Sequence, residues 1–502
     1  MSHPPMPPVP PAAPGPPPQG PPGFGPAPYA GGPYGAPPPY GPIPPSGGPG
    51  RGGKRGTAVI AACVTAALAV VAAGTLAVLH VSDGQRSAAD GKGNAPASAS
   101  PAAPSTQGRV LLNVPQPPQP DRVQDEGYRA DGAWVTPHSY ASGGPDSILG
   151  YDLDSGKQTW KLPLDGNLCR ASKEVTSQGY VAVVFAGSKK DWSKCSEIAV
   201  IDINQGRKLW QKSLPDAHRG LSMSVAVSEE LAAVSWPDEE SWGLAIDTGK
   251  TVWDSHAPGC GYEEFIGGRT LTSLALCTDH FAVSQRDPRT GKASRIAKLP
   301  NNLGYPYLAS AEPLVVASYI GDEDNWLDAN RLTTFTADGS VKKTIKVDDY
   351  ILGCTDDIGT GCGALVATQD TLYLSSRREH ITSGSHVTAL DTATGRIKWT
   401  ADLDGEGMSE LRPLRADKGD LIAYNVAGAA TEGSGVYRFA AADGQETVLL
   451  EEPADFEISE ATSQIATPKI RQPVIYEDGR LFFHLGDGLG GGAPLNFALT
   501  TH

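Results

Sequence analysis

The sequence predicts an all-β fold, an eight-bladed β-propeller of four-stranded antiparallel blades. A hairpin pattern recurs along the chain, with turn glycines roughly 40–55 residues apart, a period typical of propeller blades. Two further strand-like runs lie between successive hairpins and complete four strands per blade. Strand-like runs at 472–479, 480–485 and 493–499 indicate an eighth unit that lacks its fourth strand. The turn glycines of the other seven units are Gly156, Gly206, Gly249, Gly291, Gly339, Gly395 and Gly444.

The clearest hairpin covers residues 386–403, HVTALDTATGRIKWTADL. Apolar and polar residues alternate before and after 391–395, as they do in half-buried strands. Asp391 can bond its own backbone and Gly395 can take a positive φ, so this segment predicts a tight turn. Four residues after the glycine, three hairpins carry Arg295, Lys343 and Val448, and the other four carry Trp160, Trp210, Trp253 and Trp399.

Residues 389–399 match the pattern A-x-D-x-x-T-G-x-x-x-W, which resembles the repeat of quinoprotein-type (PQQ-binding-like) β-propellers. The resemblance covers about 108–502 and implies that the four repeat tryptophans are structural residues, each docked against the neighbouring blade. The repeat also occurs in propellers that bind no quinone, such as the scaffold lipoprotein of outer-membrane assembly. We therefore expect a membrane-anchored member of the non-enzymatic branch.

Residues 1–56 are predicted to be a disordered cytoplasmic tail. The first 50 residues hold 22 of the 44 prolines, with many glycines and almost no aliphatic residue, so they cannot bury a core. The PPPY sequence at 37–40 matches a WW-type ligand, although proline-rich tails produce such matches by chance. Recruitment of a cytoplasmic partner by this tail would make the protein a membrane sensor, which is an alternative function.

Residues 57–81 are predicted to be a single transmembrane helix. They carry no Asp, Glu, Lys or Arg, and at about 1.5 Å per residue they are long enough for a hydrocarbon core of about 30 Å. Arg51, Lys54 and Arg55 precede the segment and Asp83 follows it, which places the N-terminus in the cytoplasm. Cys63 ends a lipoprotein-like box, but the apolar run continues past it, which favours a membrane-embedded thiol.

Residues 82–107 are rich in Ala, Ser, Pro and Gly and indicate a flexible linker. Residues 108–502 then form an extracytoplasmic propeller. The net charge of the chain is −15, and all acidic residues but only part of the basic ones follow Val81. An acidic propeller argues against nucleic-acid binding, which needs basic surface. It permits cationic peptides or neutral sugars, and solubility alone is the simpler interpretation.

Strand alternation within each blade, A to D from the axis outward, decides which connections share a face. The A–B and C–D turns lie on one face, which we call the tight-turn face. The B–C and D–A connections lie on the other, the long-loop face. Extra length in connections is where binding usually resides. The long connections belong almost entirely to the long-loop face: 187–196, 236–241, 320–331, 347–362, 426–435 and 451–471.

Residues 109–114 precede blade 1 and are predicted to supply the missing outer strand of blade 8. Closure of the ring by the two ends of the chain leaves no open sheet edge. The linker would then join the propeller at the tight-turn face. Seven blades, with 470–499 packed irregularly, is the alternative.

Apart from Cys63 the chain has six cysteines, which allow 15 pairings. The face assignment favours neighbours: Cys169–Cys195, Cys260–Cys277 and Cys354–Cys362, all on the long-loop face. A metal site is disfavoured because no C-x-x-C occurs and no His lies beside these cysteines.

No catalytic constellation is recognisable in the sequence. It has no adjacent cysteine pair, such as quinone-dependent dehydrogenases carry, and no G-x-S-x-G or H-E-x-x-H. We predict no enzyme activity, no catalytic residue and no cofactor, and a quinone-dependent dehydrogenase is the disfavoured alternative.

Three B–C loops combine tryptophan with acidic residues. A tryptophan there must either pack on a blade or contact a partner, because its apolar surface is large. The acids at 322–328 suit Ca²⁺, but their spacing does not match an EF-hand, so a solvated acidic loop is favoured. The predicted function is non-catalytic binding or scaffolding of a cell-envelope protein, peptide or glycan. The candidate binding residues are Trp192, Trp236, Trp242, Asp322, Asp324 and Trp326.

Overall fold

The structure is a computed structural model in which residues 99–502 form one compact unit. The predicted transmembrane segment 57–81 lies outside the described residues, and no helix among those described is long and apolar enough to cross a membrane. The described residues are 105–117, 129–190, 194–218, 223–236, 241–254, 259–299, 303–320, 329–354, 361–376, 386–403, 409–427, 434–466, 473–486 and 493–502.

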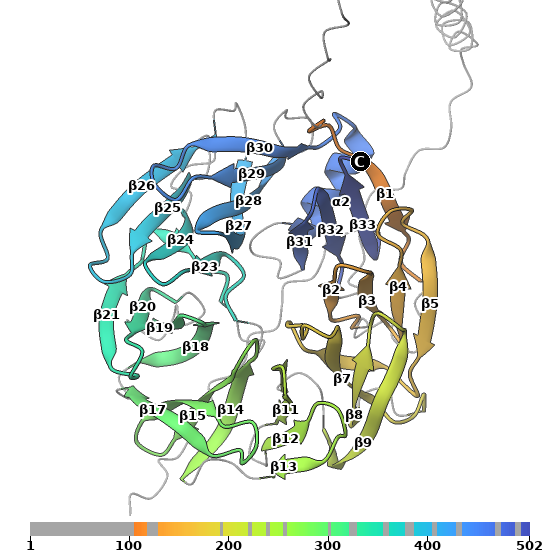
Figure 1. The fold of residues 1–502 in the computed structure, drawn as a ribbon, viewed down its shortest axis with the longest axis vertical. Helices are drawn as coiled ribbons and strands as arrows, with labels where there is room; N and C mark the ends of the chain where they lie inside the picture. The colour runs from red at the N-terminus through yellow and green to blue at the C-terminus, as the bar shows by residue number, and fades with distance from the viewer. Residues whose placement is uncertain are drawn as a thin grey trace, which may run out of the picture. The chain divides into compact units, whose positions relative to one another are not determined.

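Eight antiparallel sheets surround a common centre, and each sheet contacts the next one around the ring (Figure 1). Their strands follow chain order from the centre outward, as predicted for blades A to D. Blades 1 to 4 consist of β2 (Ala133–Val135), β3 (Tyr140–Gly144), β4 (Ser147–Tyr151) and β5 (Gln158–Pro163); β6 (Leu168–Ala171), β7 (Tyr180–Ala186), β8 (Cys195–Asp202) and β9 (Arg207–His218); β10 (Ser224–Val227), β11 (Leu231–Ser235), β12 (Ser241–Ala245) and β13 (Thr251–Trp253); β14 (Cys260–Ile266), β15 (Leu271–Cys277), β16 (Phe281–Arg286) and β17 (Ala293–Leu299).

The other four sheets follow the same order, with two exceptions. The inner strand of blade 6 is split into two short strands that both pair with β24, and the outer strand of blade 8 comes from the start of the propeller. Blades 5 to 8 consist of β18 (Gly304–Ala311), β19 (Leu314–Tyr319), β20 (Arg331–Phe335) and β21 (Val341–Lys346); β22 (Tyr350–Ile351), β23 (Leu365–Ala367), β24 (Thr371–Ser376), β25 (His386–Asp391) and β26 (Ile397–Asp402); β27 (Ser409–Asp417), β28 (Asp420–Ala427), β29 (Gly435–Phe439) and β30 (Glu446–Glu451); β31 (Val474–Glu477), β32 (Arg480–His484), β33 (Asn496–Thr500) and β1 (Arg109–Val114).

The predicted closure is confirmed. β1 pairs antiparallel with β33, from Arg109 opposite Thr500 to Val114 opposite Asn496. Two residues of the predicted linker already belong to the ring, because the Thr106 carbonyl accepts a hydrogen bond of 2.8 Å from the Glu451 amide. The chain therefore joins the propeller at the outer edge, where the tight-turn end of blade 8 meets the end of β30.

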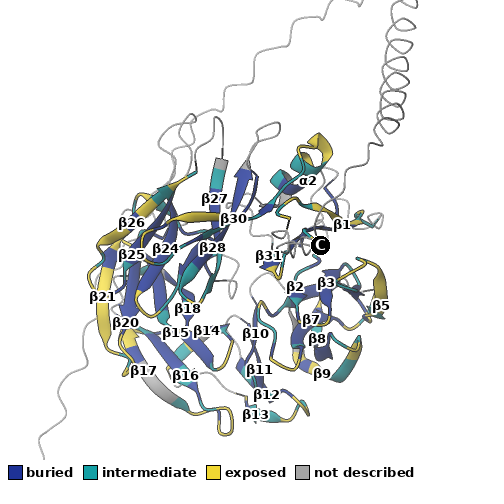
Figure 2. Ribbon diagram, turned by 45° about the horizontal axis from the view of Figure 1, so that its top comes forward, coloured by how far each residue is buried: buried dark blue, intermediate teal, exposed yellow. Residues whose placement is uncertain are grey.

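Burial decreases from the middle strands to the outer ones (Figure 2). β7 and β32 are buried almost throughout, because their two faces contact the neighbouring blades on both sides. The outer strand β21 exposes all but one of its side chains. Each blade thus contributes two apolar surfaces to the core, and the core consists of the seams between blades.

The repeat tryptophans fill these seams. The turn glycines have φ between 64° and 87°, the left-handed region that favours glycine. A Cβ added at Gly249 would lie 2.7 Å from the indole of Trp210 in the preceding blade, and one at Gly444 would lie 2.6 Å from Trp399. The indole nitrogens donate across the seam, Trp210 to the Ile246 carbonyl (2.8 Å) and Trp399 to the Ala441 carbonyl (3.0 Å). The turn therefore has to be glycine because the neighbouring blade's tryptophan lies against it.

One element differs from the prediction. The connection 451–471 contains a helix, α2 (Phe456–Ala466), where the sequence analysis expected a long loop. The Asp455 carboxylate caps it by accepting the Glu457 amide at 2.9 Å and the Ile458 amide at 3.3 Å. The helix packs on β28 and β32 and so lies over the seam between blades 7 and 8.

Candidate functional sites

Three disulfides lie at the long-loop face, and they join the pairs that the sequence predicts. Cys169–Cys195 links strands A and C of blade 2, and Cys260–Cys277 links the start of strand A to the end of strand B in blade 4. Cys354–Cys362 closes the connection that interrupts the inner strand of blade 6. These ends of strands all belong to B–C or D–A connections, so the bridges hold the bases of the long loops in place.

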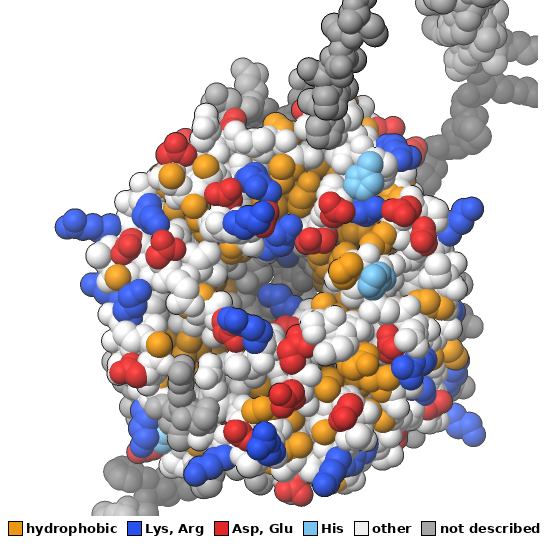
Figure 3. All heavy atoms as spheres, viewed as in Figure 1, with side chains coloured by type: hydrophobic (Ala, Val, Ile, Leu, Met, Phe, Trp, Pro, Cys, Tyr) orange, Lys and Arg blue, Asp and Glu red, His pale blue; other side chains and the backbone are white. Residues whose placement is uncertain are grey.

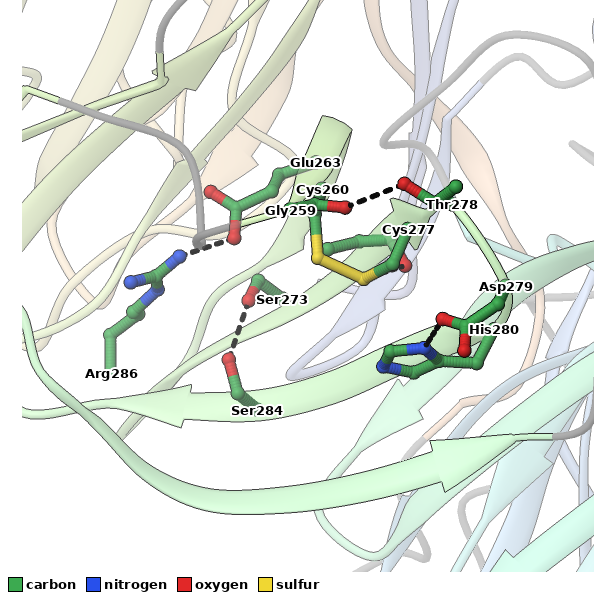
Figure 4. Close-up of a disulfide and its surroundings, with 11 residues drawn as sticks. Gly259, Cys260, Glu263, Ser273, Cys277, Thr278, Asp279, His280, Ser284 and Arg286 are labelled. Carbon is green, nitrogen blue, oxygen red and sulfur yellow. Dashed lines mark hydrogen bonds and ion pairs between the residues drawn. A yellow bond between two sulfur atoms is a disulfide. The ribbon is translucent and has the colours of Figure 1, made fainter. Parts of the chain in front are cut away.

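Blade 4 shows how such a loop base is built (Figure 4). Beside the Cys260–Cys277 bridge, the Thr278 amide and hydroxyl both donate to the Gly259 carbonyl at 3.3 Å. His280 Nδ1 lies 2.6 Å from a carboxylate oxygen of the exposed Asp279. That contact lowers the pKa of the Asp279 carboxyl, which lies exposed at the end of the blade.

Two of the predicted binding tryptophans lie in blade 3. Trp236 is fully buried in the core, so it cannot be the exposed stacking platform that the prediction considered. Trp242 is half-buried, and its ring packs edge-on against Trp236 at a centroid distance of 6.0 Å. The Lys212 ammonium lies 5.0 Å from the centre of the Trp242 ring, so a cation already occupies that ring face. Both residues follow the packing alternative, because Trp236 belongs to the core of blades 2 and 3 and Trp242, on strand β12, packs against that core.

The other predicted binding residues lie outside the described residues. These are Trp192, Asp322, Asp324 and Trp326. Trp192 falls between β7 and β8, and the other three fall between β19 and β20. Both pairs are strands B and C of a blade, so these positions belong to connections of the long-loop face.

A second cluster of charges lies at the axis, where the sequence analysis proposed no site. Figure 3 shows one face of the propeller hollowed at its centre, with basic and acidic side chains around the hollow. The Lys173 side chain is accessible to water, but many protein atoms surround it. That surrounding protein and the nearby Arg412 both lower the pKa of its ammonium. Burial likewise raises the pKa of the Glu174 carboxyl and lowers the pKa of Arg412 to about 10. The axis is therefore polar and holds charges of both signs.

The bridged connection of blade 6 reaches this cluster. A Cβ at Gly361 would lie 3.9 Å from Lys173 Nζ and 3.2 Å from the Leu308 carbonyl. Gly361 adjoins the Cys354–Cys362 bridge, while Lys173 belongs to blade 2, so the connection extends over the axis. No pattern in the sequence marks this contact, because it joins residues far apart in the chain.

A third polar group lies beneath α2. Glu452 accepts hydrogen bonds from the Tyr424 hydroxyl at 2.7 Å and the Thr462 hydroxyl at 3.3 Å. Burial raises the pKa of the Glu452 carboxyl to about 7, although these hydrogen bonds oppose the shift. The pKa of Tyr424 is also raised, first by burial and then by the adjacent Glu452. The group fastens α2 to blade 7.

The seam that closes the ring is polar as well. Asn496 Oδ1 accepts the Tyr140 hydroxyl at 2.7 Å and lies 2.9 Å from His484 Nδ1, while Asn496 Nδ2 lies 3.3 Å from the Tyr151 hydroxyl. Burial lowers the pKa of His484. These residues join blades 8 and 1 from opposite ends of the propeller sequence, and their role is therefore structural.

The described side chains can be compared with the ligands that metal and quinone sites use. In the described ranges, no group of three or more His, Cys, Asp or Glu side chains is placed to hold a metal ion. The sequence has no adjacent cysteine pair, and the six propeller cysteines are joined in bridges at the long-loop face.

A family model described as outer membrane protein assembly factor BamB matches residues 125–293 and 337–484, well over half of the chain. The chain belongs to this family. The matched ranges cover most of blades 1 to 4 and most of blades 6 to 8, so membership agrees with the PQQ-like repeat seen in the sequence. A search among curated proteins finds no match.

Three solved structures are similar to this chain. The crystal structure of BamB from Moraxella catarrhalis is 15% identical, with 74% of this chain and 95% of that chain covered and a TM-score of 0.41. The computationally designed Ika8 protein is 14% identical, with 78% and 99% covered and a TM-score of 0.44. KlHsv2 with loop 6CD replaced by a Gly-Ser linker is 11% identical, with 60% and 89% covered and a TM-score of 0.35.

Proposed function

We propose that this protein is a non-catalytic, membrane-anchored scaffold whose propeller binds a protein of the cell envelope through its long-loop face. Membership of the family described as an outer-membrane assembly factor is the observation that carries the proposal. The disulfides support it, because they fix the bases of long connections on that face. A peptide or glycan remains the alternative ligand on the same surface.

The anchor in this proposal is the apolar segment 57–81, with the N-terminus in the cytoplasm. β1 begins beside the tight-turn end of blade 8, while Thr106 just before it bonds Glu451, where the connection 451–471 of the long-loop face begins. The linker therefore joins the ring at its outer edge, and its flexibility lets the long loops meet a partner outside the membrane. Cell fractionation of the full chain and of a variant lacking 57–81 tests the anchor: only the full chain should sediment with membranes.

The binding surface is tested by quantitative capture of envelope proteins with the full chain. Trp192→Ala and Trp326→Ala, singly and together, should reduce capture of one protein at least tenfold while leaving the melting temperature unchanged. Trp236→Ala is the matched control. Loss of this buried side chain should lower the melting temperature, which the two loop substitutions should leave unchanged. Unchanged capture by the double variant would remove the long-loop tryptophans from the proposal.

A further inference from the structure

The outer strands of blades 5 and 6 expose a large apolar side chain at the same repeat position. β21 begins at Val341 and β26 at Ile397, each two residues after its turn glycine, and the two residues are 51% and 60% exposed. An apolar residue of this size is a property of these two blades and not of the repeat, because the other hairpins place polar or small residues at this position. Those residues are Gln158, Lys208, Thr251, Ala293 and Glu446.

Basic side chains flank both apolar residues along the chain. Two bases lie within two positions of each apolar residue, and all four bases are exposed. Residues 340–346 and 395–401 contain no acid. This surface is therefore apolar at two points and basic around them. We call these six residues the rim patch: Val341, Lys342, Lys343, Arg396, Ile397 and Lys398.

The two halves of the rim patch are neighbours along the edge of the ring. Ile345, near the end of β21, lies 3.2 Å from a Cβ placed on Gly395, the turn glycine that precedes β26. The Lys342 ammonium donates to the Thr392 hydroxyl of the same turn at 2.9 Å. Figure 2 shows β21 and β26 following one another along the edge, with most of their side chains exposed. The patch is therefore one surface that crosses two blades.

The rim patch keeps most of its positive charge. Among the described residues, Lys342, Lys343 and Arg396 form no ion pair with a carboxylate. The fourth base, Lys398, lies 3.5 Å from a carboxylate oxygen of Asp370. On a chain with a net charge of −15, the patch is a local reversal of sign.

The other acids beside these strands have partners of their own. The Asp391 carboxylate accepts the Thr394 hydroxyl at 2.7 Å and the Thr394 amide at 2.8 Å within its turn. Asp348 pairs with Arg331 at 3.1 Å and with Lys346 at 2.7 Å. The next outer strand, β30, carries two glutamates and no base. The basic surface of blades 5 and 6 therefore ends at blade 7.

Protection of the sheet edge explains the bases of the patch but not its apolar residues. Lysine on an outer strand keeps that strand from pairing with the edge of another sheet. An exposed valine or isoleucine on the same edge works against such protection. Apolar side chains surrounded by bases are instead typical of surfaces that lie on a membrane, where the apolar groups enter the headgroup region and the bases attract anionic lipids.

The linker brings this part of the ring within reach of the bilayer. It joins the propeller at the outer edge, where the Thr106 carbonyl accepts the Glu451 amide at the end of β30. As the flexible coil that its composition predicts, the segment 82–104 spans on the order of 25 Å. Fully extended, it reaches about 75 Å. Blades 5 and 6 can therefore contact a membrane that holds the segment 57–81.

We propose that the rim patch binds the anionic phospholipid headgroups of the membrane in which the segment 57–81 is anchored. Val341 and Ile397 enter the headgroup region, and the bases without a carboxylate partner meet lipid phosphates. The propeller then lies with its rim on the bilayer, so that the long-loop face stays accessible to a protein partner. This inference rests on the proposed function only for the membrane anchor.

The test measures how close the rim patch lies to a lipid surface. The full chain with Cys63→Ala and Thr344→Cys carries a donor fluorophore on β21 and is reconstituted into vesicles that contain an acceptor-labelled lipid. Energy transfer should rise about threefold when phosphatidylglycerol replaces part of the phosphatidylcholine, and added salt should reverse the rise. A fluorophore at Thr159→Cys, on the exposed outer strand of blade 1, is the matched control and should show no such rise.

Two double substitutions in the patch should each abolish the rise at position 344. Lys343→Glu with Arg396→Glu reverses the charge, and Val341→Ser with Ile397→Ser removes the apolar pair. All four residues are exposed, so the melting temperature should stay unchanged. Lys157→Glu with Lys161→Glu makes the same charge change on the rim of blade 1 and should leave the rise intact.

Equal energy transfer with and without phosphatidylglycerol, or an equal rise at positions 344 and 159, would overturn the proposal. Loss of the rise in the charge variant alone would show attraction without insertion and would also overturn it. Binding of soluble polyphosphate without any response to phosphatidylglycerol would assign the patch to an anionic polymer instead. Cell fractionation reports on the anchor alone. Should the chain lack that anchor, its sedimentation with added phosphatidylglycerol vesicles still tests the patch, so the two proposals can fail separately.

Discussion

The two seams of blade 4 differ in what lies beside the turn glycine. At the seam with blade 3, Trp253 lies against Gly291, and the Arg286 guanidinium stacks over its ring at 5.5 Å. Arg286 is paired with the fully buried Glu263 and donates to the Gly291 carbonyl at 3.1 Å. At the seam with blade 5, a cavity of about 490 Å³ is lined by Phe335 and Gly339, and an exposed pair, Arg269 and Glu312, lies at its rim.

The difference shows that one blade can tolerate an open seam when the ring is closed elsewhere. Each blade is held by two neighbours, and β1 ties blade 8 to the start of the propeller. Loss of indole packing at one seam then lowers stability without opening the ring.

Breaking the closed seam should have the largest effect. Glu263→Gln leaves the buried Arg286 without its counter-charge, and loss of one partner of a buried pair costs about 3–5 kcal/mol. We expect the free energy of unfolding, measured by chemical denaturation, to fall by that amount. Replacing both residues, Glu263→Gln with Arg286→Met, should recover most of the loss. A double variant as unstable as the single one would contradict the charge explanation.

The seam under α2 should respond to pH. The folded-state pKa of Glu452 is about 7 and the ordinary value is 4.5, so the folded protein prefers the protonated carboxyl. This contribution is complete below pH 4.5 and is lost as the pH rises towards 7, at most about 3 kcal/mol. Denaturation between pH 4.5 and 7.5 should show this decline in the unmodified protein and not in Glu452→Gln. The exposed Glu446→Gln serves as control and should keep the decline.

The sequence predicts the parts of a seam that rest on local or periodic patterns, and it does not predict contacts that follow no pattern along the chain. Turn glycines, repeat tryptophans and the closing strand are local or periodic signals, and all appear in the structure as expected. The contact of Glu452 with Tyr424 is not periodic, so the sequence offered no signal for it. Arg295 and Lys343 both replace a tryptophan, yet their seams differ. In blade 5, Ile345 lies 3.2 Å from a Cβ placed on Gly395, whereas no described side chain lies within 4 Å of a Cβ placed on Gly339.

Filling the open seam should make it resemble the closed one. Arg295→Trp restores the repeat pattern beside Gly339, and cavity filling of this kind commonly adds about 0.5–2 kcal/mol. The free energy of unfolding should rise by that amount. Val448→Trp provides the comparison at the same repeat position of blade 7. Equal stabilisation in both variants would attribute the gain to the tryptophan itself and not to the cavity between blades 4 and 5.

The rim pair of the open seam should contribute least. The Arg269 side chain is 84% exposed and that of Glu312 is 30% exposed, so water and salt screen their attraction. Exposed pairs contribute about 0–1 kcal/mol, and Glu312→Gln should lower the free energy of unfolding by no more than that. The same Glu-to-Gln change at Glu263, on the other side of blade 4, costs several times more because both partners there are buried. Raising the salt concentration should abolish the small effect at Glu312 and leave that at Glu263. A loss at Glu312 comparable to that at Glu263 would mean that the rim pair holds blades 4 and 5 together and that the seam is closed in solution.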